Sequence, residues 1–186
     1  DAVIAQGLEA GGHRGHFLST DLSLQMGTFA LLPQMVAALD IPVIAAGGIA
    51  DASGVAAAMA LGAAGAQVGT AYLLCPEATT TDLHRTALKS KLAQHTALTN
   101  VFSGGAARGI VNRIMHELGP MSELAPPFPL AGSASAPLRS AAEKAGSSDF
   151  SPLWSGQNNS VCKAIPAADL TRELAAKVPP MASIKQ

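Results

Sequence analysis

The chain has 186 residues, a formal net charge of −1 and 48% hydrophobic residues, so it is long enough and apolar enough for one globular domain with a real core. Its 12 Lys and Arg residues are scattered, which excludes the basic footprint of a nucleic-acid-binding protein. No stretch approaches the roughly 20 apolar residues of a membrane span. We therefore expect neither nucleic acid nor a membrane as a partner.

Cysteine and histidine spacing gives no sign of a metal site. Cys75 and Cys162 lie far apart and form neither a CxxC motif nor a Cys/His ligand pattern. This usage is typical of a reducing compartment, so we expect a cytoplasmic protein with two ordinary thiols and no metal. Surface or capping roles are expected for the histidines that fit no ligand spacing, namely His16, His84, His95 and His116.

The chain opens abruptly. Asp1 leads straight into the apolar run at 2–5, which has the character of a strand buried on both faces. Because an independent domain rarely begins in mid-strand, we expect this chain to be a fragment that lacks an upstream portion.

The first seventy residues alternate between strand and helix patterns. A Phe29, Leu32, Val36, Leu39 stripe predicts a helix that ends before Pro42, and Asp51 can cap a second helix that ends near Gly62. Strands separated by helices at this spacing predict βαβ units in a parallel sheet, with ligand chemistry at the carboxyl ends of the strands. The expected strands are 2–5, 43–45 and 66–68.

Beyond Thr70 the pattern changes. Apolar spacing predicts a helix over 83–92, an extended segment over 96–102 and an amphipathic helix over 107–118 that stops at Gly119. Five prolines between 120 and 137 predict an irregular surface crossing. Short helices are expected over 138–145 and after Pro166.

The stretch QGLEAGGHRG, residues 6–15, places His13 in a glycine-dense loop directly after the first strand. Unshielded glycine amides allow a planar or anionic ligand to approach the main chain, and imidazole can move a proton near neutral pH. The spacing alone does not separate this reading from a loop histidine that only bonds the backbone.

Two further glycine turns follow consecutive strands. Gly47 and Gly48 precede a helix that Asp51 starts, and Gly69 with Thr70 follows the next strand. Each turn alone is as consistent with tight packing as with binding. As a pair on consecutive strands they match the phosphate site that (β/α)8 barrels place after their last two strands.

Five blocks in this order resemble nitronate monooxygenase, formerly called 2-nitropropane dioxygenase, a family of FMN-dependent (β/α)8 TIM barrel flavoproteins. The first three are shared with related flavin barrels, including the FMN-dependent enoyl-acyl-carrier-protein reductase, whereas the last two narrow the resemblance. It runs from residue 1 to about 178 and covers only the C-terminal half of the family. The blocks are QGLEAGGHRG, PVIAAGGIAD, GAQVGT, FSGGAARGIVNR and LWSGQ.

The resemblance implies an α/β fold that forms the C-terminal part of the barrel, about strands 6 to 8, with a C-terminal helical and irregular extension. Residues 1–100 would be the barrel portion, and 101–186 a family-specific helical and proline-rich region packed on it. The missing N-terminal half of the barrel would then be the partner of this chain. The oligomeric state is left open, and a homo-oligomer is one of the states allowed.

The resemblance also implies the site. His13 would be the catalytic residue facing the flavin, where it stabilises the nitronate anion or accepts a proton from a neutral nitroalkane. Residues around the FMN would include, with the weakest assignment last, Gln6, Gly11, Gly12, Gly47, Gly48, Gln67, Val68, Gly69, Thr70 and Ser103.

The implied oxidoreductase reaction is oxidation of an alkyl nitronate by O2 to a carbonyl compound and nitrite, with no metal and no reduced nicotinamide. FMN would perform the redox chemistry while the protein orients the reactants. The alternatives are another FMN barrel oxidoreductase, such as the enoyl-acyl-carrier-protein reductase, which requires NAD(P)H, and an inactive truncated chain. Which nitronate is preferred, and whether this piece is active alone, the sequence does not decide.

The chain departs from the family pattern at two positions. The turn after Asp51 lacks an arginine, and Gly105 stands where an arginine is expected. Both changes remove positive charge near the anion site and bear on substrate fit more than on FMN binding.

Four more positions carry expectations. Glu9 either orients His13 or is solvated, and core packing is favoured for Trp154 over a place in the wall of the site. Arg108 is expected to be a surface charge, as is Arg113, unless they reach the flavin phosphate.

Overall fold

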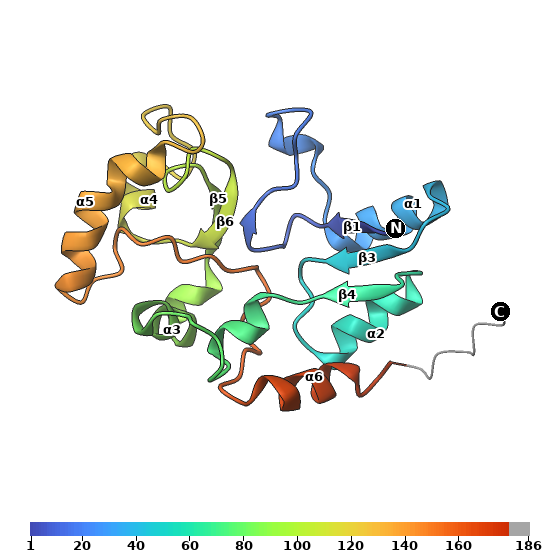
Figure 1. The fold of residues 1–186 in the computed structure, drawn as a ribbon. Coiled ribbons are helices and arrows are strands. Elements are labelled where there is room, and N and C mark those ends of the chain that lie inside the picture. Colours follow the sequence, from blue (N-terminus) through green and yellow to red (C-terminus); the bar gives the residue numbers. More distant parts are fainter. Residues whose placement is uncertain (179–186) are drawn as a thin grey trace.

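The computed structural model describes residues 1–178, and the end of the predicted C-terminal region, 179–186, lies outside them. A three-stranded parallel sheet has the order β1-β3-β4 (Figure 1). Its strands are β1 (Val3–Gln6), β3 (Val43–Ala46) and β4 (Gly65–Gln67). In register, Val3 lies opposite Val43 and Ile44 opposite Gly65. The parallel βαβ arrangement and the α/β class are therefore confirmed.

The connecting helices begin and end close to where the sequence pattern places them. α1 (Thr28–Ala38) follows β1, and α2 (Ala52–Ala60) follows β3. The carboxylate of Asp51 accepts a hydrogen bond from the Gly54 amide at 2.7 Å, which confirms the predicted N-cap. Leu32 of α1 is fully buried in a core shared with the sheet, and that core fixes the helix against the strands.

A second sheet is antiparallel and has the order β2-β6-β5. Its strands are β2 (Gly12–His13), β6 (Ala107–Ile110) and β5 (Thr96–Thr99). The helix predicted over 107–118 is therefore wrong in its first part, since only α4 (Arg113–Leu118) is helical. All four residues of β6 are buried, and a fully buried short strand lacks the alternation that distinguishes it from a helix in sequence.

The prediction of an irregular crossing over 120–137 is wrong at its end. α5 (Ala131–Lys144) begins before Pro137 and includes it, so the helix predicted over 138–145 is the second half of a longer one. Proline removes one backbone hydrogen bond from a helix. The cost is tolerated here because the carbonyl left without that partner belongs to Ser133, which is exposed to water.

The remaining elements link the two sheets. The predicted helix over 83–92 is α3 (Asp82–Lys89) followed by the 3-10 helix η3 (Lys91–Gln94). After α5 the chain returns across the molecule, and α6 (Ala167–Ala175), which Pro166 precedes as expected, packs against α2 (Figure 1). Shorter 3-10 turns are η1 (Leu22–Leu24) and η2 (Thr70–Leu74).

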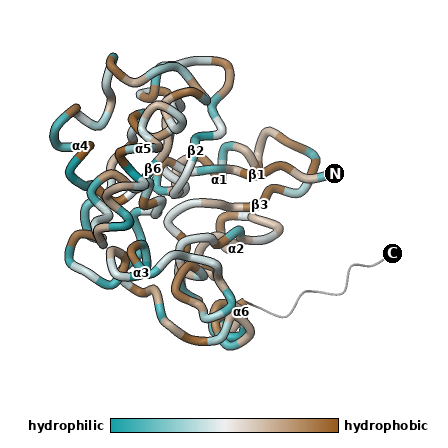
Figure 2. The backbone as a smooth tube through the Cα atoms, turned by 60° about the vertical axis from the view of Figure 1, so that its left-hand side comes forward, coloured by the Kyte–Doolittle hydropathy of each residue, from teal (hydrophilic) through white to brown (hydrophobic). Residues whose placement is uncertain are grey.

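Apolar side chains remain uncovered beside β1. Ile4 is 51% exposed, and Phe17 and Leu18 are 90% and 102% exposed. The residues of β1 and β3 are mostly hydrophobic, as the colouring of the backbone tube shows (Figure 2). Within residues 1–178, β1 hydrogen-bonds a neighbouring strand on one side only. No helix of the described part is long and apolar enough to cross a membrane.

Candidate functional site

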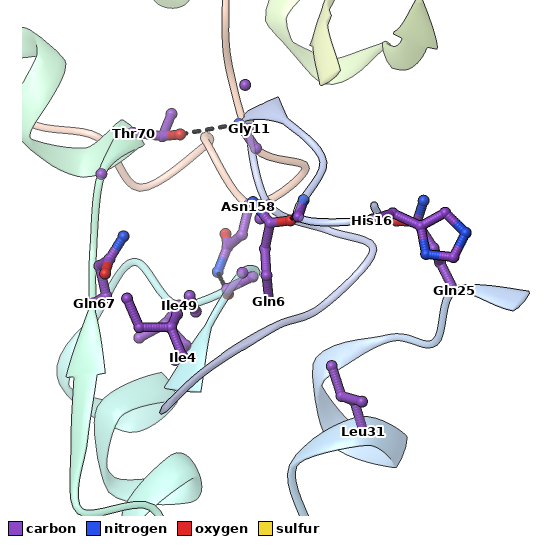
Figure 3. Close-up of a pocket in the computed structure, with 18 of the residues that line it drawn as sticks. Ile4, Gln6, Gly11, His16, Gln25, Leu31, Ile49, Gln67, Thr70 and Asn158 are labelled. Atoms are coloured by element: carbon purple, nitrogen blue, oxygen red, sulfur yellow. Dashed lines mark hydrogen bonds between the residues drawn. The ribbon is translucent and has the colours of Figure 1, made fainter. Parts of the chain in front are cut away.

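A cavity of about 800 Å³ extends from the carboxyl ends of β1, β3 and β4 along the open edge of β1, where Ile4 and Leu31 also line it. This is the edge of a parallel sheet where loops converge and ligands bind. Its lining includes predicted site residues from three loops together with residues of the segment 154–158 (Figure 3). The predicted residues that line it are Gln6, Gly11, Gly12, Gly47, Gly48, Gln67, Gly69 and Thr70.

The turn after β3 presents backbone amides to the cavity. Gly47 and Gly48 have φ of 108° and 73°, a conformation that residues with a side chain rarely adopt. The carbonyl of Gly48 accepts a hydrogen bond from Asn158 Nδ2 at 2.8 Å. Within residues 1–178, the Gly48 amide has no acceptor. Asn158 thus fixes the turn through the Gly48 carbonyl, and the Gly48 amide is left as a donor for a ligand.

The turn after β4 is similar. In the described chain the amides of Gly69 and Thr70 have no acceptor, and a Cβ placed on Gly69 would meet no atom within 4 Å. Thr70 Oγ1 accepts from the Gly156 amide at 2.9 Å, so the hydroxyl proton is left for a ligand. Gln67 is exposed to the cavity, whereas Val68 packs into the core beneath.

Gln6 ties the histidine loop to the first strand. Its Nε2 donates to the His13 carbonyl at 2.9 Å, and its Oε1 accepts from the Gly15 amide at 2.7 Å. A Cβ on Gly11 would lie 2.5 Å from the Gly156 amide nitrogen, so this position requires glycine. Gln6 and Gly11 therefore shape the loop as well as lining the cavity.

His13 and Ser103, which are 90 positions apart, form a pair. His13 Nε2 lies 2.8 Å from Ser103 Oγ, which also donates to the Gly105 carbonyl at 3.1 Å. A hydroxyl has one proton to donate, and a carbonyl can only accept. We therefore assign the proton of the imidazole to Nε2, which donates to Ser103, and the lone pair to Nδ1.

Aromatic rings surround this imidazole. The Phe128 ring lies edge-on to it, with centroids 5.7 Å apart, and the Trp154 ring lies at 5.5 Å on a tilt. Trp154 also packs edge-on against Phe102 at 5.6 Å and lines the cavity. Trp154 thus combines the core and wall positions that the sequence posed as alternatives, and it links the cavity to His13.

Two buried arginines lie beneath the histidine loop. Arg14, only 7% exposed, donates to the carbonyls of Gly7 and Ala10 at 2.7 and 2.9 Å. Arg108, 5% exposed, donates through Nε to the Leu8 carbonyl at 2.9 Å. The prediction that Arg108 is a surface charge is wrong, because it lies on a buried strand rather than a helix.

Burial lowers the pKa of both guanidinium groups. The Arg14 pKa is lowered further by the charge of Arg108, and the nearby Glu9 carboxylate partly offsets the effect for each. Both guanidinium groups carry positive charge, because arginine is not deprotonated in proteins. Gly105 lacks the positive charge of the arginine expected there, but Arg14 and Arg108 supply positive charge below the histidine loop.

Glu9 follows neither of its predicted roles. Its carboxylate accepts from the Thr28 amide at 2.9 Å and from the Thr28 hydroxyl at 3.0 Å. A carboxylate at the first turn of α1 is favoured by the helix dipole. Glu9 therefore fixes the histidine loop to α1 instead of orienting His13.

Sequence reasoning also missed Asn158 and the role of His84. Asn158 directly follows the LWSGQ block, and this position in the sequence could have indicated that it belongs to the site. His84 Nε2 bonds the Trp154 carbonyl at 3.0 Å, and burial lowers its pKa. His84 thus holds the backbone at Trp154 in place, a role beyond the surface or capping role that was predicted for it.

The cavity is large enough and of the right chemistry for a phosphate-bearing planar cofactor. Its volume is within the range of cofactor sites, and its lining among the described residues contains His16 but no Asp, Glu, Lys or Arg. An anion would be held by free amides and neutral side chains, as in glycine-turn phosphate sites. No cluster of three His, Cys, Asp or Glu able to hold a metal occurs within residues 1–178.

Residues 1–177 match the family model described as nitronate monooxygenase. Over 175 residues the chain is 43% identical to the nitronate monooxygenase of Pseudomonas aeruginosa, which covers 94% of this chain and 50% of the relative. It is 43% identical over 160 residues to a probable nitronate monooxygenase of Staphylococcus saprophyticus, covering 85% of this chain and 45% of that relative. The chain therefore spans about half the length of these relatives.

Two solved structures are similar in fold. Nitroalkane oxidase from Streptomyces ansochromogenes matches with a TM-score of 0.85 and 41% identity, over 95% of this chain and 51% of that one. FabK from Thermotoga maritima matches with a TM-score of 0.69 and 26% identity, over 95% of this chain and 54% of that one.

Proposed function

The chain belongs to the nitronate monooxygenase family of oxidoreductases, and from this premise we propose that it forms the FMN phosphate site and carries the acid–base histidine of an enzyme that oxidises alkyl nitronates. The products would be a carbonyl compound and nitrite, with O2 as the oxidant. The observation that carries the proposal is the His13–Ser103 pair beside an amide-lined cavity.

The phosphate of FMN would be bound by the free amides of Gly48, Gly69 and Thr70. Asn158 holds the first of these turns and Gly156 contacts the second. The amide donors of both turns are therefore oriented before a ligand arrives. When bound, FMN supplies the redox chemistry.

His13 would handle the proton and the charge of the substrate. With Nε2 donating to Ser103, its Nδ1 lone pair is the group that accepts a proton from the α-carbon of a neutral nitroalkane. Once protonated, the imidazolium stabilises a nitronate anion beside it. The buried Arg14 and Arg108 add positive potential beneath the loop, which favours an anionic substrate.

The rest of the barrel would cover β1. Its free edge and the exposed side chains of Ile4 and Phe17, which line the same cavity, form a surface suited to a further strand and its helices. We assign to that surface the segment that corresponds to the other half of the relatives, and we place the three parallel strands near the end of the barrel order.

Nitrite release under air from FMN-loaded protein and an alkyl nitronate tests the proposal. His13→Gln should reduce turnover of neutral nitroalkanes by about 100-fold or more, since it removes the general base. His116→Gln, a change at an exposed histidine of α4, serves as the matched control. NAD(P)H oxidation without nitrite would contradict the proposal and favour a reductase.

A further inference from the structure

Phe128 lies beside the proposed catalytic histidine on a segment that the described mechanism does not use. It is 63% exposed, and its ring makes a T-shaped contact with the His13 imidazole. Trp154 lies near the same imidazole. Both ring centroids lie within 6 Å of the imidazole centroid, so the carbon substituents of a small anion bound against His13 would lie close to apolar rings.

The Phe128 ring rests on a position that has no side chain. A Cβ on Gly105 would lie 3.1 Å from Phe128 Cδ2 and 3.7 Å from His13 Cδ2. Contacts of 3.1 Å require the neighbour to shift, so any side chain at 105 would displace the ring or occupy the space next to the imidazole. Gly105 thus leaves room that Phe128 partly fills.

The segment that carries Phe128 is itself fixed. Gly104, with φ of 86°, packs so closely under the backbone of 126–128 that a Cβ there would clash with Pro126 and Phe128 main-chain atoms. The same turn holds Ser103, the partner of His13. One turn therefore sets the distance between the aromatic ring and the imidazole.

We infer that Phe128, seated on the side-chain-free Gly105, selects substrates by the size of the apolar substituent on the anion that His13 binds. This inference rests on the proposed function for the identity of the anion. The apolar rings favour alkyl substituents over charged ones, and the ring of Phe128 limits their length.

Two series of planar anions test this inference. Both are measured on the complete gene product. Alkyl nitronates of increasing chain length report kcat/KM by nitrite release. Alkyl carboxylates of the same lengths are redox-inert, and their binding can be followed by isothermal titration calorimetry. Affinity for carboxylates does not depend on turnover.

Phe128→Ala should raise the preference for long over short chains by about tenfold or more in both series, because contacts with single methylene groups differ by such factors. Gly105→Ala should shift the preference in the opposite direction. Leu124→Ala, at a 78% exposed position of the same segment, is the matched control and should change the ratio less than about twofold.

The outcomes separate the two claims. Nitrite release with an unchanged chain-length preference in Phe128→Ala and Gly105→Ala would overturn the inference and leave the proposed function standing. A shifted carboxylate preference without nitrite release would support the size selection and contradict the proposed chemistry. If carboxylates do not bind and nitrite is not released, both are wrong.

Discussion

The parallel sheet and the antiparallel sheet contribute to the cavity in different ways. Turns at the ends of β3 and β4 supply free amides, and no Asp, Glu, Lys or Arg side chain lines the cavity within the described residues. Beside the antiparallel sheet, Arg14 and Arg108 are buried under the loop that carries His13. The comparison teaches that anion binding and positive charge are separated: amides contact the ligand, and guanidinium groups hold the loop from below.

The largest effect is expected from substitution of Arg108, because this side chain supports the histidine loop from below. Arg108→Met should lower the free energy of unfolding by about 3 kcal/mol, because the part-buried Leu8 carbonyl loses its charged donor. Urea denaturation measures the change. Arg113→Met is the matched control, since Arg113 forms an exposed i,i+4 ion pair with Glu117, and it should cost less than about 0.5 kcal/mol. Equal effects would mean that Arg108 does not support the loop.

A smaller effect is expected at the contact between the histidine loop and the C-terminal segment. In Gly11→Ala the new Cβ would meet the Gly156 amide and the Ser155 carbonyl carbon, which lies 2.6 Å away, so about 2 kcal/mol of stability should be lost. Gly15→Ala in the same loop meets only Gln6 Oε1 at 3.5 Å and should be close to neutral. Thermal unfolding of both variants would sharpen the claim that the loop is fixed by backbone contact.

The smallest effect concerns the thiol behind the Thr70 turn. Burial raises the pKa of Cys162 to about 11, and its Sγ lies 3.5 Å from the Thr70 carbonyl. Because the folded pKa is above the unfolded value, this contribution to stability is present below the unfolded pKa and is lost as the pH rises toward 11. Stability should therefore fall above pH 9 in the wild type and fall less in Cys162→Ala. An identical pH dependence in both would contradict a buried neutral thiol.

The sequence predicted the parallel half well because its signals are local. Asp51 caps the helix that directly follows it, and the change from helix to strand spacing at Pro42 is visible in a few residues. The predicted cavity residues Gly48 and Gly69 also follow their own strands. Local patterns of this kind suffice where neighbouring elements in sequence are neighbours in space.

The antiparallel half could not be read in this way. β6 pairs with β5 and with β2, which lies about a hundred positions earlier, and no local pattern reports that pairing. The burial of Arg108 depends on the Leu8 carbonyl, and the place of Asn158 depends on Gly48. The His13–Ser103 bond likewise joins distant segments, although the resemblance to the family had placed both residues in the site.

Binding of FMN and of riboflavin to the purified chain, compared between Gly69→Ala and Gly54→Ala, tests the central claim most directly. A Cβ on Gly69 meets no protein atom but would fill the space assigned to the phosphate, whereas Gly54 lies within α2, outside the cavity lining. We predict that Gly69→Ala weakens FMN binding by about tenfold or more and leaves riboflavin binding unchanged, while Gly54→Ala alters neither. Equal affinity of Gly69→Ala and the wild type for FMN, or no binding of FMN by the wild type, would contradict a phosphate site in this chain.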